Sequence, residues 1–286
     1  MKDRTVMVKW INSLPKKHLL PVDRTLHGAI DTPEVRTVVH LHGARVSPES
    51  NGHPEAWFTK GYKETGPFFS TEVYTYTNHQ QAATLWYHDH ALGITRLNVY
   101  AGLAGFYIIR DHLEQRLNLP SGEYEIPLLI QDRSFNKNGS LFYPAEPPQP
   151  VPGVFPSVVP IFLGNTILVN GKVWPYLNVE PRKYRFRILN GSNSRTYTLR
   201  LSNGQKFYQI GTDGGLLESP VELDALTLMP AERADVIIDF SGSKGKYIIL
   251  TNDDTDENTS NVMQFRVVLP LKGKDTSTIP ATLYPF

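Results

Sequence analysis

The clearest structural pattern in the sequence is the stretch Lys183-Tyr184-Arg185-Phe186-Arg187-Ile188-Leu189, in which apolar and charged side chains alternate. Successive side chains of a β-strand point to opposite faces, so Tyr184, Phe186 and Ile188 share one face and the charges share the other. The pattern returns in residues 197–201 after a short polar turn. Such alternation is typical of half-buried strands, and it predicts an all-β protein.

Short segments with the same alternation recur along the chain, and 22 Pro and 21 Gly are scattered between them as turn signals. Further strands are predicted at residues 72–77, 84–90, 104–109, 125–131, 166–170, 206–210, 234–240, 246–250 and 262–269. A spacing of about 8–12 residues between turn signals favours sandwiches or barrels over a parallel sheet. Helical periodicity is not sustained anywhere, although a turn or two of helix is expected near 90–100 and 112–117.

The chain of 286 residues has room for one large or two ordinary domains. An apolar strand ending at Ile109 gives way to a charged segment, which predicts one domain at residues 1–112 and a second at 113–275. The stretch 144–160 contains seven Pro. It is predicted to be an extended surface connection, because Pro lacks a donor for a sheet ladder. Residues 276–286 are expected to form a linker that leads toward a further domain.

The composition excludes several classes of protein. With 40% hydrophobic and 20% charged residues, the chain is expected to fold, and no apolar run approaches the roughly 20 residues that span a bilayer. A formal net charge of +1 offers no surplus of positive charge to a phosphate backbone. Neither a membrane nor a nucleic acid is therefore expected as a partner. The first ten residues lack the apolar core of a secretory signal, so no export is predicted.

Four of the nine His stand in two His-x-His pairs, His40-Leu41-His42 and His88-Asp89-His90. Residues i and i+2 of a strand project from the same face about 6.5–7 Å apart, so each pair offers two imidazoles to a common space. Two such strands facing one another would supply four nitrogen ligands. That donor set suits Cu, Zn, Fe or Ni and disfavours Mg and Ca.

These pairs allow two other interpretations. Some of the His side chains could be ordinary core or surface residues satisfied by hydrogen bonds. Zinc hydrolases with a His-x-His-x-Asp-His motif need an Asp four residues after the first His, and Ala44 stands there. The complete absence of Cys also excludes disulfides, thiolate nucleophiles and every metal site that needs a Cys sulfur.

The residues around the pairs resemble a known family. The segments 37–43 and 85–91 resemble the first two copper motifs of multicopper oxidases, His-Leu-His-Gly and Trp-Tyr-His-Asp-His, and segments 52–58 and 95–103 resemble their neighbours. Segments 167–177 and 180–187 look like the second domain of bacterial spore-coat laccases. The resemblance runs through nearly the whole chain and covers the first two domains of that family.

The resemblance implies two cupredoxin-like Greek-key β-sandwiches out of three. By position, His40 would match a type 2 copper ligand, while His42, His88 and His90 would match ligands of the type 3 copper pair. The other four ligands of the trinuclear cluster, and the type 1 copper with its Cys, belong to the third domain in this family. The chain is therefore expected to be a truncated laccase, with an incomplete first domain, half of the cluster ligands and no type 1 site.

Two functional hypotheses follow. In the first, the protein derives from a laccase that oxidises phenols and reduces O2 to water, and it is inactive alone until a third cupredoxin domain is supplied. In the second, it is a non-catalytic copper-binding or structural β-sandwich module. Either way copper is the expected cofactor, and self-association through an exposed copper face is a further expectation. The resemblance also suggests synthesis in the cytoplasm and a place in the spore coat.

Overall fold

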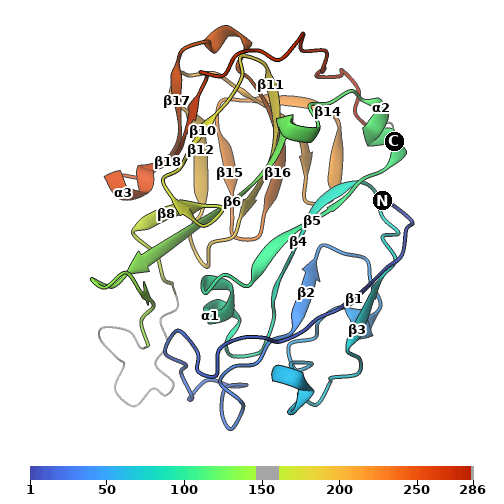
Figure 1. Ribbon diagram of the computed structural model, residues 1–286, viewed down its shortest axis with the longest axis vertical. Coiled ribbons are helices and arrows are strands. Elements are labelled where there is room, and N and C mark those ends of the chain that lie inside the picture. The colour runs from blue at the N-terminus through green and yellow to red at the C-terminus, as the bar shows by residue number, and fades with distance from the viewer. Residues whose placement is uncertain (146–160, 285–286) are drawn as a thin grey trace.

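The computed structural model describes residues 1–145 and 161–284, so the connection predicted at 144–160 lies almost entirely outside the described residues. Strands dominate the described part and form four sheets (Figure 1). The all-β prediction is confirmed, and each strand predicted from alternation overlaps an observed strand. None of the helices in residues 1–145 and 161–284 has the length and apolarity that a bilayer crossing demands.

Two small sheets come from the first part of the chain. The strands β2 (Val39–His42), β4 (Ala83–Asp89) and β5 (Ala104–Ile109) form an antiparallel sheet with β4 in the centre. The strand β1 (Val6–Lys9) pairs with β3 (Val73–Tyr76). One buried cluster joins the two sheets through Leu41, Tyr74, Tyr76, Leu85 and Ile109.

Two larger sheets come from the later part of the chain. The first has the order β14 (Gly215–Leu223), β13 (Phe207–Thr212), β16 (Arg233–Asp239), β11 (Lys183–Asn190), β6 (Glu125–Phe135), β8 (Thr166–Val169), β9 (Lys172–Val173), with β7 (Leu141–Phe142) paired to β6. The second has the order β10 (Tyr176–Asn178), β18 (Asn261–Arg266), β17 (Tyr247–Asn252), β12 (Tyr197–Leu201), β15 (Leu226–Leu228). Apolar side chains of both sheets form one core, to which Phe186, Val236, Leu250 and Phe265 belong.

The helices are short and lie in connections. They are α1 (Thr95–Tyr100), α2 (His112–Arg116), α3 (Glu257–Ser260) and the 3-10 turns η1 (Pro48–Ser50), η2 (Lys60–Tyr62), η3 (Gly122–Tyr124) and η4 (Ser241–Ser243). The two helical turns predicted near 90–100 and 112–117 are confirmed as α1 and α2. Asp111 caps α2 by accepting a hydrogen bond from the backbone N–H of Glu114. The strand β14 was not predicted because Pro220 interrupts its pattern, and it lies at a sheet edge, where Pro is tolerated.

No sheet in the described residues mixes strands from the two sides of residue 112. The limits 1–112 and 113–275 themselves remain predictions. Beyond residue 275 the described chain turns back toward α2 (Figure 1). Leu283 is 1% exposed there and packs with Leu119, Ile210 and Ile237.

A buried cluster of charges joins the two parts of the chain. Arg185 and Arg187 project from the charged face of β11, yet they are only 2% and 1% exposed. The interpretation of this strand as half-buried is therefore wrong, because its second face is covered by other elements and not by solvent. Both guanidinium groups contact Glu114 Oε1, at 2.7 and 2.6 Å. Arg187 also contacts Glu125 Oε1 at 2.5 Å.

The cluster reaches the strand that carries the second His pair. Arg187 Nη1 donates to Thr84 Oγ1 of β4 at 2.7 Å, and Arg185 Nη2 lies 2.6 Å from Asp235 Oδ2. Burial alone would raise the pKa of Asp235, but Arg185 and Arg187 outweigh it and hold this pKa below its ordinary value. The pKa of Glu125 is lowered in the same way against the effect of burial. The carboxylates are thus held in their charged form by the arginines that they orient.

We predict that Arg187→Met destabilises the protein by about 3–5 kcal/mol, because it removes one of the two buried cations that face the carboxylates of this cluster. Arg200→Met is the matched control, since the side chains of Arg200 and Asp253 are 46% and 45% exposed and such pairs contribute about 1 kcal/mol or less. Chemical denaturation of both variants measures the difference. Equal midpoints for the two variants would contradict a supporting role for the cluster.

The lowered carboxyl pKa values also predict a dependence on pH. In the unfolded chain these carboxyls titrate near pH 4. Since the pKa values of Asp235 and Glu125 are lower in the folded protein, their contribution to stability is complete above about pH 4 and is lost as the pH falls through the folded values. The free energy of unfolding, measured with denaturant at each pH, should fall below about pH 4, and less steeply in Arg187→Met. A free energy of unfolding that stays constant down to about pH 2 would contradict a contribution from these carboxylates.

Candidate metal centre

The four paired His side chains lie around one cavity. Strands β2 and β4 are antiparallel neighbours with His40 opposite His88. Because side chains of paired residues project from the same face of a sheet, His40 and His88 lie on one face. The ring centroids of His40 lie 5.6, 5.5 and 4.8 Å from those of His42, His88 and His90. The structure therefore brings together all four residues that the spacing singled out.

Backbone carbonyls fix the orientation of three of these rings. His40 Nδ1 lies 2.6 Å from Asn51 O, His90 Nδ1 lies 2.9 Å from Gly52 O, and His88 Nδ1 lies 2.7 Å from Asp89 O. A carbonyl can only accept a hydrogen bond, so each Nδ1 carries the proton and each Nε2 presents a lone pair. These carbonyls were missed by sequence reasoning, because no residue type marks a carbonyl that accepts from a ring.

The fourth ring is oriented differently. His42 Nδ1 faces His88 Nε2 at 3.3 Å, and one ring nitrogen each from His40, His42 and His88 lies within 4.8 Å of the others. Two ligands of one ion at about 2.0–2.1 Å and at a tetrahedral angle are about 3.3 Å apart. The spacing of the His42 and His88 nitrogens thus fits two ligands of one first-row metal ion.

Burial favours the neutral form of three of the imidazoles. Burial lowers the pKa of His88 to about 4. Burial, followed by the nearby charge of Arg233, lowers the pKa of His42 to about 4. The pKa of His40 is also lowered, mainly by burial. Because a metal binds the unprotonated ring, this environment leaves the ligand atoms available at neutral pH.

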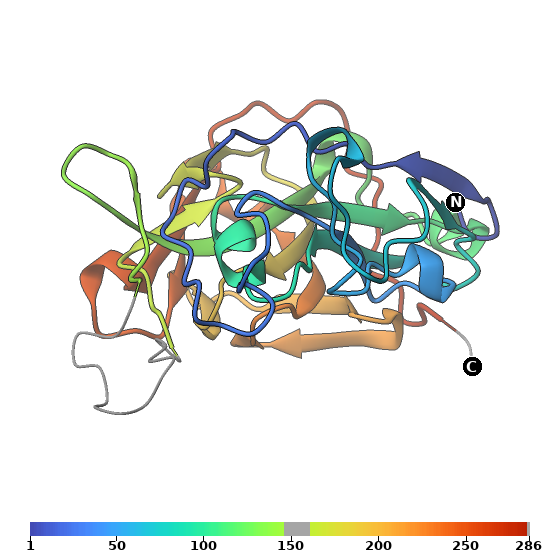
Figure 2. The same ribbon diagram turned by 90° about the horizontal axis from the view of Figure 1, so that it is seen from below.

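The later part of the chain builds a wall of the cavity. Apart from the four His, the lining residues are Trp86 from β4, Thr95, Arg96 and Val99 from α1, and Ser192, Asn193, Pro230 and Ala231 from two connections. Asn193 Nδ2 donates to Arg96 O at 3.0 Å, so α1 is joined directly to that wall. Seen from below, α1 lies among the N-terminal loops with the later strands beside it (Figure 2).

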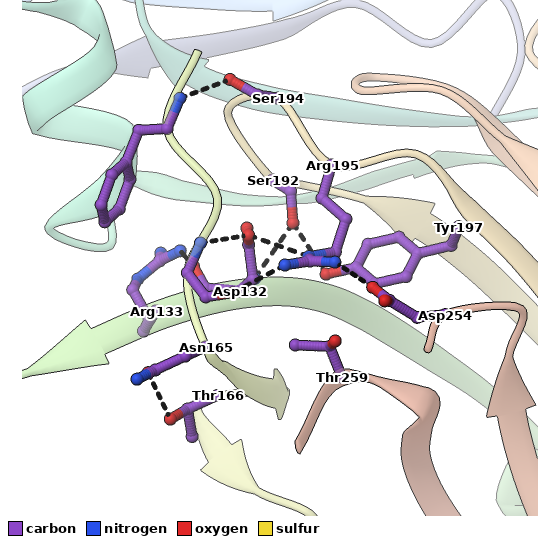
Figure 3. Close-up of polar contacts among 12 residues, drawn as sticks. Asp132, Arg133, Asn165, Thr166, Ser192, Ser194, Arg195, Tyr197, Asp254 and Thr259 are labelled. Atoms are coloured by element: carbon purple, nitrogen blue, oxygen red, sulfur yellow. Dashed lines mark hydrogen bonds and ion pairs between the residues drawn. The ribbon is translucent and has the colours of Figure 1, made fainter. Parts of the chain in front are cut away.

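A polar network holds the connection that carries Ser192 (Figure 3). Ser192 Oγ accepts from Asp132 N at 3.0 Å and shares a hydrogen bond with Tyr197 Oη at 2.9 Å. Arg195 Nε lies 3.1 Å from Asp132 Oδ2, and its Nη1 pairs with Asp254. The wall of the cavity is therefore fixed by polar side chains from the later part of the chain and not by the His pairs.

Asp89 lies between two of the His residues but does not join them in the cavity. Its carboxylate is 1% exposed and accepts from Thr37 Oγ1 at 2.8 Å, from Val38 N at 3.3 Å and from Ala91 N at 3.0 Å. Burial raises its pKa to about 6 against the effect of these donors. It fastens β2 to the turn that follows β4, which keeps His90 in place.

The donor set fits copper. It consists of four imidazoles, three of them oriented by carbonyl acceptors, and imidazole is a favoured ligand of copper. The described residues that line the cavity include no carboxylate, which disfavours Mg and Ca.

Family comparisons agree with the donor chemistry. Two family models, both described as multicopper oxidase, match residues 29–114 and 146–268. A laccase of Bacillus subtilis (strain 168) is 56% identical over 296 residues, which cover 99% of this chain and 58% of that protein. The multicopper oxidase LPR1 of Arabidopsis thaliana is 44% identical over 294 residues, covering 97% of this chain and 50% of that protein. The chain thus spans about half the length of the curated relatives that it matches.

Solved structures show the same likeness. A variant of the McoA multicopper oxidase from Aquifex aeolicus superposes with a TM-score of 0.76 at 33% identity, covering 99% of this chain and 57% of that one. A laccase from Pediococcus acidilactici gives a TM-score of 0.72 at 36% identity, covering 87% of this chain and 50% of that one. These neighbours share the cupredoxin-like architecture of sandwiched sheets.

We predict that Asp89→Ala lowers the free energy of unfolding of the metal-free protein by about 1–3 kcal/mol, because buried donors on Thr37, Val38 and Ala91 lose their acceptor. Asp253→Ala is the control, since Asp253 takes part in an exposed ion pair and should change stability by about 1 kcal/mol or less. Urea denaturation measures both variants. An Asp89→Ala protein as stable as its control would show that this carboxylate does not fasten the two segments.

Proposed function

Since this chain belongs to the multicopper oxidase family, we propose that His40, His42, His88 and His90 bind copper and form half of the centre at which a laccase reduces O2. The observation that carries the proposal is the convergence of four imidazoles on one cavity, three of them with Nδ1 facing a backbone carbonyl. The copper would supply one-electron redox chemistry. The protein residues orient the rings, and burial lowers the pKa values of His40, His42 and His88, which favours their neutral form.

The individual roles are assigned as follows. His40 would serve a type 2 copper, and His42, His88 and His90 would serve the type 3 pair. The 3.3 Å separation of His42 Nδ1 and His88 Nε2 supports a common ion for these two rings. His40 and His90 stack with centroids 4.8 Å apart, so the rings of one residue in β2 and of one residue just after β4 lie side by side in the cavity.

The full laccase reaction is also a proposal for a protein larger than these 286 residues. Electrons from a phenol enter a laccase at a blue copper that needs a Cys thiolate, and this sequence has no Cys. We propose that such a site, and the remaining imidazoles of the centre, come from residues outside this sequence, whether in the same protein or in another chain. The division of this chain into two domains, residues 1–112 and 113–275, belongs to the same proposal.

Copper titration of the purified 286-residue chain tests the proposal. His88→Ala removes a buried ligand and should weaken copper binding by more than the roughly 10–100-fold that loss of an outer partner costs. His79→Ala is the control, because the side chain of His79 is 69% exposed and pairs with Asp3. Calorimetry and paramagnetic resonance would follow binding.

The same titration has two further outcomes. Bound copper should give no intense blue band, because that band needs a thiolate ligand. Copper binding without any phenol oxidase activity agrees with half of a centre and equally with a non-catalytic copper module, and adding a separately produced partner domain distinguishes these two. Copper binding that is equal in His88→Ala and His79→Ala would overturn the assignment of the four His residues.

A further inference from the structure

Two consecutive backbone carbonyls contact two different His rings of the cavity. Asn51 O accepts from His40 Nδ1 at 2.6 Å, and Gly52 O accepts from His90 Nδ1 at 2.9 Å. His40 belongs to β2, whereas His90 follows the end of β4. A segment of two residues therefore orients one ring from each His-x-His pair.

The segment lies directly on β2. Gly52 has a φ of +73°, and a Cβ added there would lie 2.1 Å from Val39 O and 2.9 Å from His40 Cα. Real side chains do not approach a backbone so closely, so only Gly brings this carbonyl within reach of His90. The preceding turn is fastened as well, because buried Ser50 accepts through Oγ from Thr75 N of β3 at 2.9 Å.

We propose that Asn51 and Gly52 are positioning residues, a carbonyl clip that makes His40 and His90 present Nε2, as a pair, to the cavity. The role of the clip in metal binding rests on the proposed copper function, whereas the geometry of the clip does not. A carbonyl acceptor excludes a lone pair at the Nδ1 that it faces, so it selects one tautomer of the neutral ring. Because both carbonyls belong to one short segment, displacement of that segment releases both rings.

The clip acts on two rings and leaves the other two alone. His88 Nδ1 is held by Asp89 O, and His42 Nδ1 faces His88 Nε2, so neither ring contacts the segment 51–52 through that nitrogen. A general loosening of the cavity would affect all four rings. Loss of the clip should change His40 and His90 selectively.

Gly52→Ala in the metal-free 286-residue chain tests the clip, with Gly61→Ala as the matched control. Gly61 has a similar φ of +66°, but a Cβ added there meets nothing within 4 Å. Both variants therefore carry the same kind of backbone strain, while only Gly52→Ala pushes its segment away from β2. Long-range ¹⁵N–¹H correlation spectra report which ring nitrogen of each His carries the proton.

We expect the unchanged protein and Gly61→Ala to show the Nδ1-protonated tautomer at His40, His88 and His90. In Gly52→Ala, His40 and His90 should become mixtures of tautomers while His88 keeps its form. If Gly52→Ala does not fold, Ser50→Ala, which removes the hydrogen bond to Thr75 but keeps Gly52, should shift the same two rings and leave His88 unchanged. Tautomers of His40 and His90 that stay fixed in the folded variants would overturn the proposal.

Copper titration of the same variants separates the clip from the proposed function. If both hold, the dissociation constant for copper rises by about 10–100-fold in Gly52→Ala, the usual cost of losing an outer partner of a metal ligand, and stays unchanged in Gly61→Ala. If the tautomers shift while copper binds none of the proteins, the clip is supported and the copper function is not. If copper binds equally well to all variants although the tautomers shift, the clip has no role in metal binding and that part of the proposal fails.

Discussion

The arrangement of this protein depends on a set of buried guanidinium and carboxylate groups between its sheets. Arg185 and Arg187 project from β11 and contact Glu114 at the start of the later part of the chain, and Arg187 also donates to Thr84 in β4. Arg233 of β16 reinforces this link by donating through Nε to Thr84 O at 2.9 Å. Buried ion pairs gain little over apolar packing, but they tolerate only one geometry. They therefore fix where the His-bearing strand stands relative to the large sheets.

That placement matters because the cavity is assembled from both parts of the chain. Strands β2 and β4 supply the imidazoles, while Ser192 and Asn193 come from a connection between β11 and β12. The network of Asp132, Arg195 and Tyr197 holds this connection on the side of the large core. A change in the ionic cluster would move one wall of the cavity relative to the four His rings, without contacting any of these rings directly.

Within the cavity, uncharged backbone groups orient most of the His rings. Three rings are held by carbonyls, and Asp89 points away to bind backbone donors instead. Carbonyl acceptors select a tautomer without adding a formal charge near the ligands. A cavity that keeps imidazoles together in this way suits copper. Membership of the multicopper oxidase family is consistent with that metal.

The sequence by itself determined most of the strands and the two His-x-His pairs that line the cavity. The period of two in residues 183–189 depends only on local backbone geometry, and so does the shared direction of His40 and His42 or of His88 and His90. Tertiary structure alone decided that the charged face of β11 is buried, because burial depends on what packs against a strand. It also decided that Asn51 and Gly52 face His40 and His90. Every residue has a carbonyl, so its partner is set by the path of the chain and not by side-chain identity.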